Sequence, residues 1–105
     1  MTVKVTFYIG LNDKDAKVQL IDSITASHIV ENVFAKHEVD GATTSFARGI
    51  YKHNDGTVVT EETILVQVFE FGEPIDVAAI CEDLKAFLNQ ESIAVEKQET
   101  DSKLY

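Results

Sequence analysis

The sequence predicts an α+β fold in the order βαββαβ, with a four-stranded antiparallel sheet and two helices on one face. Three observations predict it. An opening stretch alternates apolar and polar residues, two later stretches carry apolar residues at helical spacing, and Asn54-Asp55-Gly56 joins two apolar runs as a β-hairpin turn. Right-handed crossovers fold this order into the split βαβ, or ferredoxin-like, sandwich, with the first and third strands central and the other two at the edges.

The opening strand is expected around Val3 to Ile9, where every second residue is apolar, and Gly10 ends it. Residues 11–22 fit either a strand or the start of a helix. A first helix is expected from about Ser23 to His37, with Ser23 or Thr25 as its N-cap.

The second half of the chain contributes another helix and a last strand. Pro74 is expected to start the helix, since proline is favoured in a first turn, and Asn89-Gln90 to end it. Ile93 and Val95 predict a short final strand, and residues 98–105 a polar C-terminal tail.

The hairpin from Gly41 to Phe71 decides which residues share a face. A two-residue turn at Asp55-Gly56 would pair Tyr51 with Thr60, Phe46 with Leu65 and Ala42 with Phe69. Residues 60–63 are expected to interrupt the second strand. The two predicted faces are Phe46, Leu65, Phe69 and Phe71 on one side, and Ala47, Ile64, Val66 and Val68 on the other.

Both predicted faces are apolar, but two helices can cover only one. Which face meets the helices stays open. The other face is expected to pair with further copies of the chain, because exposed apolar surface of this size usually marks an interface. We therefore expect a homo-oligomer.

The length, composition and charge of the chain limit which kinds of protein and partner are expected. With 105 residues, of which 45% are hydrophobic, the chain suits a single domain over residues 1–105. There are 18 Asp and Glu against 9 Lys and Arg, a net charge of -9, so neither nucleic acid nor an anionic membrane is an expected partner. The start of the chain has no apolar signal run, and no stretch approaches the ~20 apolar residues of a membrane span. A cytoplasmic location is expected.

The polar residues near the hairpin tip are the candidate ligand-binding residues: Arg48, Tyr51, His53, Glu61 and Glu62. The alternative for Arg48 and a glutamate is a cross-strand salt bridge. Cys81, the single cysteine, lies on the apolar side of the second helix and is expected to be buried and unreactive. No spacing fits a zinc site or a phosphate-binding loop, so no catalytic residue, metal or cofactor is expected.

The element order, the strand ending in Ile9-Gly10, the long hairpin and Arg48-Gly49-x-Tyr51 resemble PII-like proteins, and more loosely the CutA proteins. The stretch from Asp40-Gly41 through Asp55-Gly56-Thr57 to Phe71 is also similar to a small uncharacterised family of the same build. The resemblance implies a ferredoxin-like subunit in a trimer, with a dimer possible, and ligands or partners at the hairpin. The nucleotide-binding glycines and basic residues of PII proteins match no position here.

These observations favour a non-enzymatic, PII-like oligomeric module that binds a small molecule or a protein through the 48–62 hairpin tip and the subunit clefts. Two alternatives remain open. One is an enzyme of the dimeric α+β-barrel kind, with Tyr8, Arg48 and Tyr51 as polar candidates in a pocket between sheet and helices. The other is a structural or interaction protein from a phage or mobile element.

Overall fold

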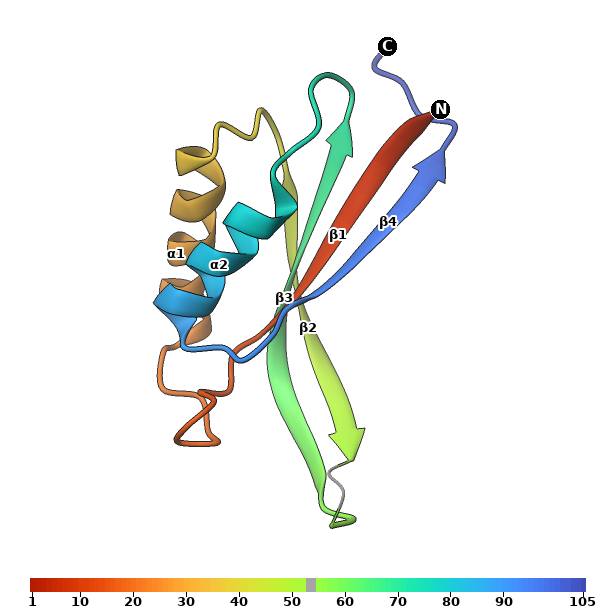
Figure 1. Cartoon of the computed structure of the whole chain (residues 1–105). Coiled ribbons are helices and arrows are strands. Elements are labelled where there is room, and N and C mark those ends of the chain that lie inside the picture. The colour runs from red at the N-terminus through yellow and green to blue at the C-terminus, as the bar shows by residue number, and fades with distance from the viewer. Residues whose placement is uncertain (53–54) are drawn as a thin grey trace.

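The computed structural model describes residues 1–52 and 55–105 and contains six elements in the predicted βαββαβ order. They are β1 (Thr2–Gly10), α1 (Ser23–Lys36), β2 (Thr43–Lys52), β3 (Val58–Glu70), α2 (Val77–Leu88) and β4 (Ala94–Thr100). The sheet order is β2-β3-β1-β4, and each neighbouring pair is antiparallel. Both helices cover the same face, and the β2–β3 hairpin projects beyond them (Figure 1). The α+β, ferredoxin-like prediction is confirmed.

The core lies between the sheet and the helices. Phe7 of β1 and Phe34 of α1 meet edge to face at its centre, with ring centroids 5.0 Å apart. The other fully or almost fully buried side chains from the central strands and helices are Val5, Ile9, Ile64, Val66, Val68, Ala26, Val30, Val33, Ile80, Leu84 and Leu88. The predicted apolar stripes of both helices therefore supply the core, although Phe87 stays 57% exposed.

The helix starts differ from the prediction. Asp22, not Ser23 or Thr25, caps α1, because its carboxylate accepts from the backbone N–H of Thr25 at 2.9 Å and from the Thr25 hydroxyl at 2.8 Å. The second helix begins at Val77 rather than at Pro74, since Asp76 caps it by accepting from Ala79 N–H at 3.1 Å. Its predicted end is confirmed, with Asn89 as the C-cap.

The strand register of the hairpin is shifted by one residue from the prediction. Tyr51 pairs with Val59 and Phe46 with Ile64. The last pair of the ladder is Lys52 with Val58, so the predicted register, in which Asp55-Gly56 forms a two-residue turn, is wrong. The strand β3 also continues through residues 60–63 without the expected interruption.

The observed register shows which side chains of the hairpin lie on the helix side of the sheet and which lie on its open face. Ile64, Val66 and Val68 are buried against the helices, and Leu65 and Phe69, which alternate with them along β3, lie on the open face. Phe46 moves to the helix side as the partner of Ile64, and Ala47 moves to the open face as the partner of Thr63. The open face is mixed rather than apolar throughout, because β1 and β3 also present Lys4, Thr6, Tyr8 and Gln67 there.

Three smaller features complete the fold. Residues 98–100, expected in the tail, belong to β4, which pairs with β1 as far as Thr100 with Thr2. Cys81 is half-buried rather than buried, and this burial raises the pKa of its thiol. Across the described residues, none of the helices has the length and apolar character needed to span a membrane.

Candidate functional site

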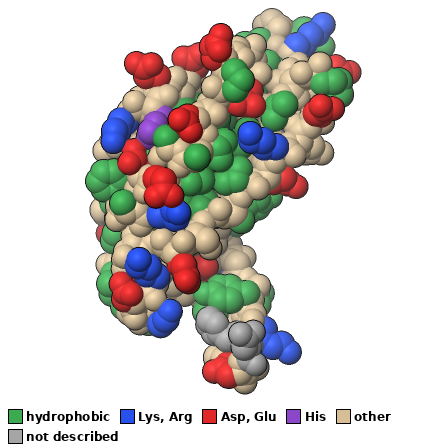
Figure 2. Space-filling view, viewed as in Figure 1, with side chains coloured by type: hydrophobic (Ala, Val, Ile, Leu, Met, Phe, Trp, Pro, Cys, Tyr) green, Lys and Arg blue, Asp and Glu red, His purple; other side chains and the backbone are tan. Residues whose placement is uncertain are grey.

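A cavity of about 480 Å³ lies where the hairpin leaves the body of the protein, and we call it the hairpin cavity. Its lining comes from three segments: the loop after β1, the β2–β3 hairpin, and the loop after α2. The residues are Asn12, Asp13, Lys14, Lys17, Tyr51, Asp55, Thr57, Val59, Glu61, Gln90, Glu91 and Ser92. Figure 2 shows the surface hollowed between the projecting hairpin and the lower end of the body, where charged side chains of both signs gather.

Two of the five predicted site residues line this cavity. Tyr51 and the cross-strand neighbour Val59 supply one wall, and Glu61 lies two residues further along β3. Because side chains alternate along a strand, Glu62 points to the opposite face, where its carboxylate accepts from the Arg48 guanidinium at 2.9 Å. Arg48 and Glu62 therefore form the predicted cross-strand salt bridge and do not line the hairpin cavity. His53 lies outside the described residues.

The Glu61 carboxylate is held in the cavity by the loop that follows β1. Its Oε2 accepts a hydrogen bond from the backbone N–H of Asn12 at 2.9 Å. Its carboxyl group lies beside Gly10, at the end of the neighbouring strand β1. No sequence motif links Glu61 to this loop, because the two are brought together only by the β1–β3 pairing.

The loop wall is built by hydrogen bonds between residues 13–17 and Asn89. The Asp13 carboxylate accepts from Asp15 N–H at 3.0 Å and Ala16 N–H at 2.9 Å, and the Asn89 amide donates to Asp13 at 2.8 Å. The bond from Ala16 N–H, followed by that from Asn89, lowers the pKa of Asp13. Lys17 is held with φ at 64°, in the left-handed region that few side chains adopt.

Sequence reasoning missed the loop residues of the cavity: Asn12, Lys14, Lys17, Gln90 and Glu91. Residues 11–22 fold instead as a turn-rich loop with a single bridge between Asn12 and Gln19. The one available signal was the run Asn12-Asp13-Lys14-Asp15, whose side chains favour turns. Such a run predicts a loop but not which strand the loop approaches.

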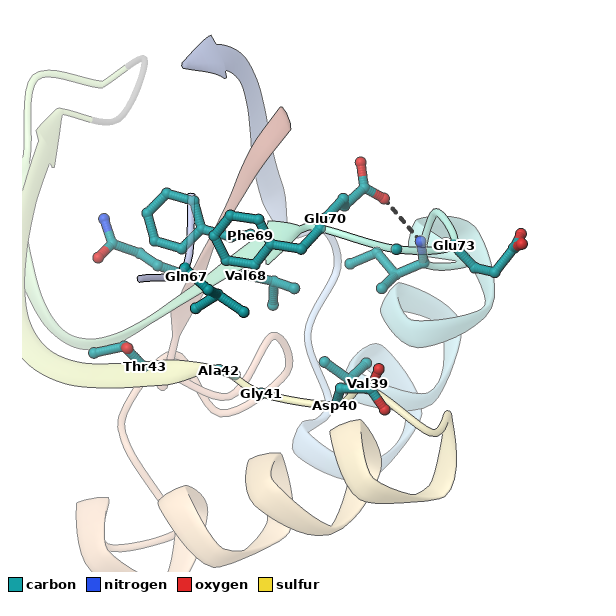
Figure 3. A pocket seen from close by; sticks show the side chains of 14 residues that line it. Val39, Asp40, Gly41, Ala42, Thr43, Gln67, Val68, Phe69, Glu70 and Glu73 are labelled. Carbon is teal, nitrogen blue, oxygen red and sulfur yellow. Dashed lines mark hydrogen bonds between the residues drawn. The ribbon is translucent and has the colours of Figure 1, made fainter. Parts of the chain in front are cut away.

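A second cavity, of about 510 Å³, lies at the other end of the sheet, between the start of β2 and the end of β3 (Figure 3). Phe69 and Phe71 stack beside it with ring centroids 5.5 Å apart. Its charged lining residues are Asp40, Glu70 and Glu73, and the Glu70 carboxylate already accepts from Ile75 N–H at 2.8 Å. It contains none of the predicted site residues, so the hairpin cavity is the better candidate.

Two further groups bear on the chemistry. The Tyr8 hydroxyl donates to Glu96 at 3.1 Å on the open face, and this bond is the main reason that the pKa of Tyr8 is raised. Tyr8 is not among the residues that line the hairpin cavity. Within residues 1–52 and 55–105, no group of three or more His, Cys, Asp or Glu side chains could hold a metal ion.

Comparison with known proteins finds similar solved structures but no similar sequence. No protein-family model matches the chain, and no curated protein matches it significantly. A solved phage SAM lyase in complex with S-methyl-5'-thioadenosine matches with a TM-score of 0.67 and 22% identity, over 93% of this chain and 81% of that one. A phage SAM lyase in the apo state matches with a TM-score of 0.65 and 22% identity, over 91% and 78% of the two chains.

This likeness establishes the fold and corrects one expectation. The two matched structures are of an enzyme, and one holds a small nucleoside ligand, so the expectation of a non-enzymatic module is wrong. The resemblance to PII-like proteins is supported only at the level of the general fold. The alternative of a phage-type protein or an enzyme fits the matches better than the PII-like interpretation does.

Proposed function

We propose that this chain is a lyase that cleaves S-adenosylmethionine and releases S-methyl-5'-thioadenosine, with its substrate in the hairpin cavity. The observation that carries the proposal is the pairing of a fold shared with phage SAM lyase with a cavity into which Glu61 and Tyr51 both project. The volume of about 480 Å³ lies in the range of small-molecule sites.

The charge of the cavity suits this substrate. Among the described residues, four carboxylates line it, from Asp13, Asp55, Glu61 and Glu91, against the two ammonium groups of Lys14 and Lys17. S-adenosylmethionine carries a sulfonium, an ammonium and a carboxylate, and so one net positive charge. A lining with two excess negative charges attracts such a cation, while a lysine offers a partner for the substrate carboxylate.

The chemistry requires placement more than acid–base groups. Release of the thioether breaks the bond between sulfur and Cγ of the methionine portion, and the bonding electrons leave with the neutral sulfur. The substrate's own carboxylate can displace this leaving group at Cγ, which closes a lactone without water and without net proton transfer. An enzyme accelerates such a step by holding the reacting atoms in line. In this proposal the Glu61 carboxylate fixes the ammonium or the ribose hydroxyls through hydrogen bonds.

The test compares two neighbouring glutamates that the sheet points in opposite directions. Purified protein is incubated with S-adenosylmethionine, and S-methyl-5'-thioadenosine is measured by chromatography. Glu61→Gln should lower kcat/KM by about 10²-fold or more, as expected when a charged group in contact with substrate is removed. Glu62→Gln, which breaks only the exposed pair with Arg48, should keep the wild-type rate.

The results that overturn the proposal are equally definite. If the wild-type protein releases no thioadenosine product, the lyase assignment is wrong. If the activity survives Glu61→Gln and is instead lost in Gln67→Ala, which alters the cavity of Figure 3, the assigned location is wrong.

We also propose that the chain forms a homo-oligomer through the open face of the sheet, with a trimer preferred. Leu65, Phe69 and Tyr8 lie on that face, with Phe69 42% and Tyr8 38% exposed. Phe71 adds to this apolar area by stacking on Phe69. Covering these side chains with a second copy would stabilise the assembly in proportion to the apolar area removed from water.

A further inference from the structure

Gly10 lies directly beside the Glu61 carboxyl group. A side-chain carbon added at Gly10 would collide with the Glu61 carboxyl group, at 2.5 Å from its Cδ and 2.6 Å from its Oε2. Among the described residues other than the chain neighbours of Gly10, the three atoms nearest to this position all belong to the Glu61 carboxyl group, which therefore occupies the space left by the missing side chain. The backbone of Gly10 is not in the positive-φ region, so its conformation does not demand glycine.

The second support of the Glu61 carboxylate is a backbone N–H that is itself fixed. Asn12 N donates to Glu61 Oε2 at 2.9 Å. The carbonyl of Asn12 accepts from the Gln90 side chain at 2.8 Å, and Asn12 bridges to Gln19. One residue earlier, Leu11 N donates to the carbonyl of Glu62 at 3.0 Å, which holds the chain of β1 against β3 at this point.

The groups described above that hold the Glu61 carboxylate are backbone atoms, namely those of Gly10 and the N–H of Asn12. We propose that Gly10 is a positioning residue of the site. Because Gly10 has no side chain, the Glu61 carboxyl group can lie against its Cα, where it accepts the hydrogen bond from Asn12 N–H and faces the hairpin cavity. We call this position of the carboxyl group the Gly10 seat. A larger residue at position 10 pushes the carboxylate out of this seat without altering the groups that line the rest of the cavity. The catalytic part of this inference rests on the proposed role of Glu61 in the lyase reaction.

The test is Gly10→Ala, with Gly72→Ala as the matched control. Gly72 has nothing within 4 Å of an added Cβ and is not in the positive-φ region, so its replacement leaves Glu61 in place. Gly10→Ala should lower kcat roughly 10- to 100-fold with a smaller change in KM, because misplacement of a positioned group acts mainly on the reacting geometry. Gly72→Ala should match the wild type in both constants.

A spectroscopic measurement separates the positioning from the activity. The amide resonance of Asn12 should move to the same new position in Gly10→Ala as in Glu61→Gln, relative to wild type, because both variants weaken its hydrogen bond to a carboxylate. It should not move in Gly72→Ala. An unchanged Asn12 resonance in Gly10→Ala would contradict the proposed role of Gly10 in placing the Glu61 carboxylate. If the resonance shifts but the wild-type protein has no lyase activity, only the proposed function is refuted.

If Gly10→Ala folds poorly, a double-mutant cycle decides the same point. The loss of stability caused by Gly10→Ala should largely disappear when Glu61→Ala is also present, because the atoms that collide with the new Cβ have been removed. An equal loss in both backgrounds would mean that the backbone, rather than the Glu61 carboxyl group, requires glycine at this position, and the inference would be wrong.

Discussion

His37 at the end of α1 and Asp83 in α2 lie 2.7 Å apart, measured from Nε2 to Oδ2, and this contact ties the two helices together. Lys36 reaches the same carboxylate at 3.1 Å. The bond to His37, followed by that to Lys36, lowers the pKa of Asp83. The ionised carboxylate is therefore favoured by folding.

The first prediction concerns the pH dependence of stability. A pKa lowered by folding contributes stability above the unfolded-state pKa of about 3.9, and this contribution is lost as pH falls through the folded-state pKa. Asp83→Asn should lower the urea midpoint at pH 7 and flatten its decline in the acid range. Glu31→Gln, which alters an exposed pair with His28, is the control and should leave the midpoint nearly unchanged. Parallel acid limbs in Asp83→Asn and wild type would contradict the assignment.

The second prediction uses adjacent residues on the two faces of β3. Val66 is 0% exposed in the core, so Val66→Glu buries a carboxylate at a cost of several kcal/mol and should unfold the subunit. Leu65→Glu should leave a folded subunit, because Leu65 lies on the open face. Circular dichroism reports folding and light scattering the mass. A wild-type mass of a single chain at micromolar concentration would remove the proposed oligomer.

The third prediction concerns Cys81. Its half-burial raises the pKa of the thiol, so less thiolate is present near neutral pH than in the unfolded chain. A thiol reagent should modify the native protein more slowly than the same protein in urea, when the reagent's reaction with a free thiol is used as the reference under each condition. Equal corrected rates would mean that this part of α2 does not protect the sulfur.

The fourth prediction concerns Asn89, which combines a φ of 48° with side-chain hydrogen bonds to Asp13 and Asp15. Asn89→Gly keeps the backbone conformation and loses those bonds, whereas Asn89→Ala loses the bonds and adds strain of about 1 kcal/mol. Urea unfolding should rank wild type above Asn89→Gly and Asn89→Gly above Asn89→Ala. The reverse order of the two variants would show that the backbone conformation is not the costly feature.

The fold could be predicted from the sequence because its periodicities are local. The alternation in β1 and the helical stripe through Val30 and Phe34 identify their own buried faces. The hairpin register could not be predicted in the same way, because it depends on the number of residues in the connection. The shift from the pair Phe46–Leu65 to the pair Phe46–Ile64 moved Phe46 across the sheet.

The candidate site was predictable only in part, for the same physical reason. Tyr51 and Glu61 belong to the hairpin, whose sequence already marked it as a polar tip. The residues that complete the cavity, such as Lys14 and Gln90, come from loops distant in the sequence. Only the three-dimensional pairing of β1 with β3 places the Asn12 amide beside the Glu61 carboxylate.

The length of β3 affects which residues can be substituted without a loss of stability. Its pairing with β1 covers Thr63–Glu70, whereas residues 58–62 pair along a full ladder only with β2. Amide protons in that outer stretch should therefore exchange through local opening, well before those of the sandwich. Tyr51 thus lies on a part of the chain that contributes little to the global folding equilibrium, whereas Glu61 is also tied to the loop after β1 through Asn12 N–H. Substitutions there can change ligand preference with little effect on the free energy of unfolding of the domain.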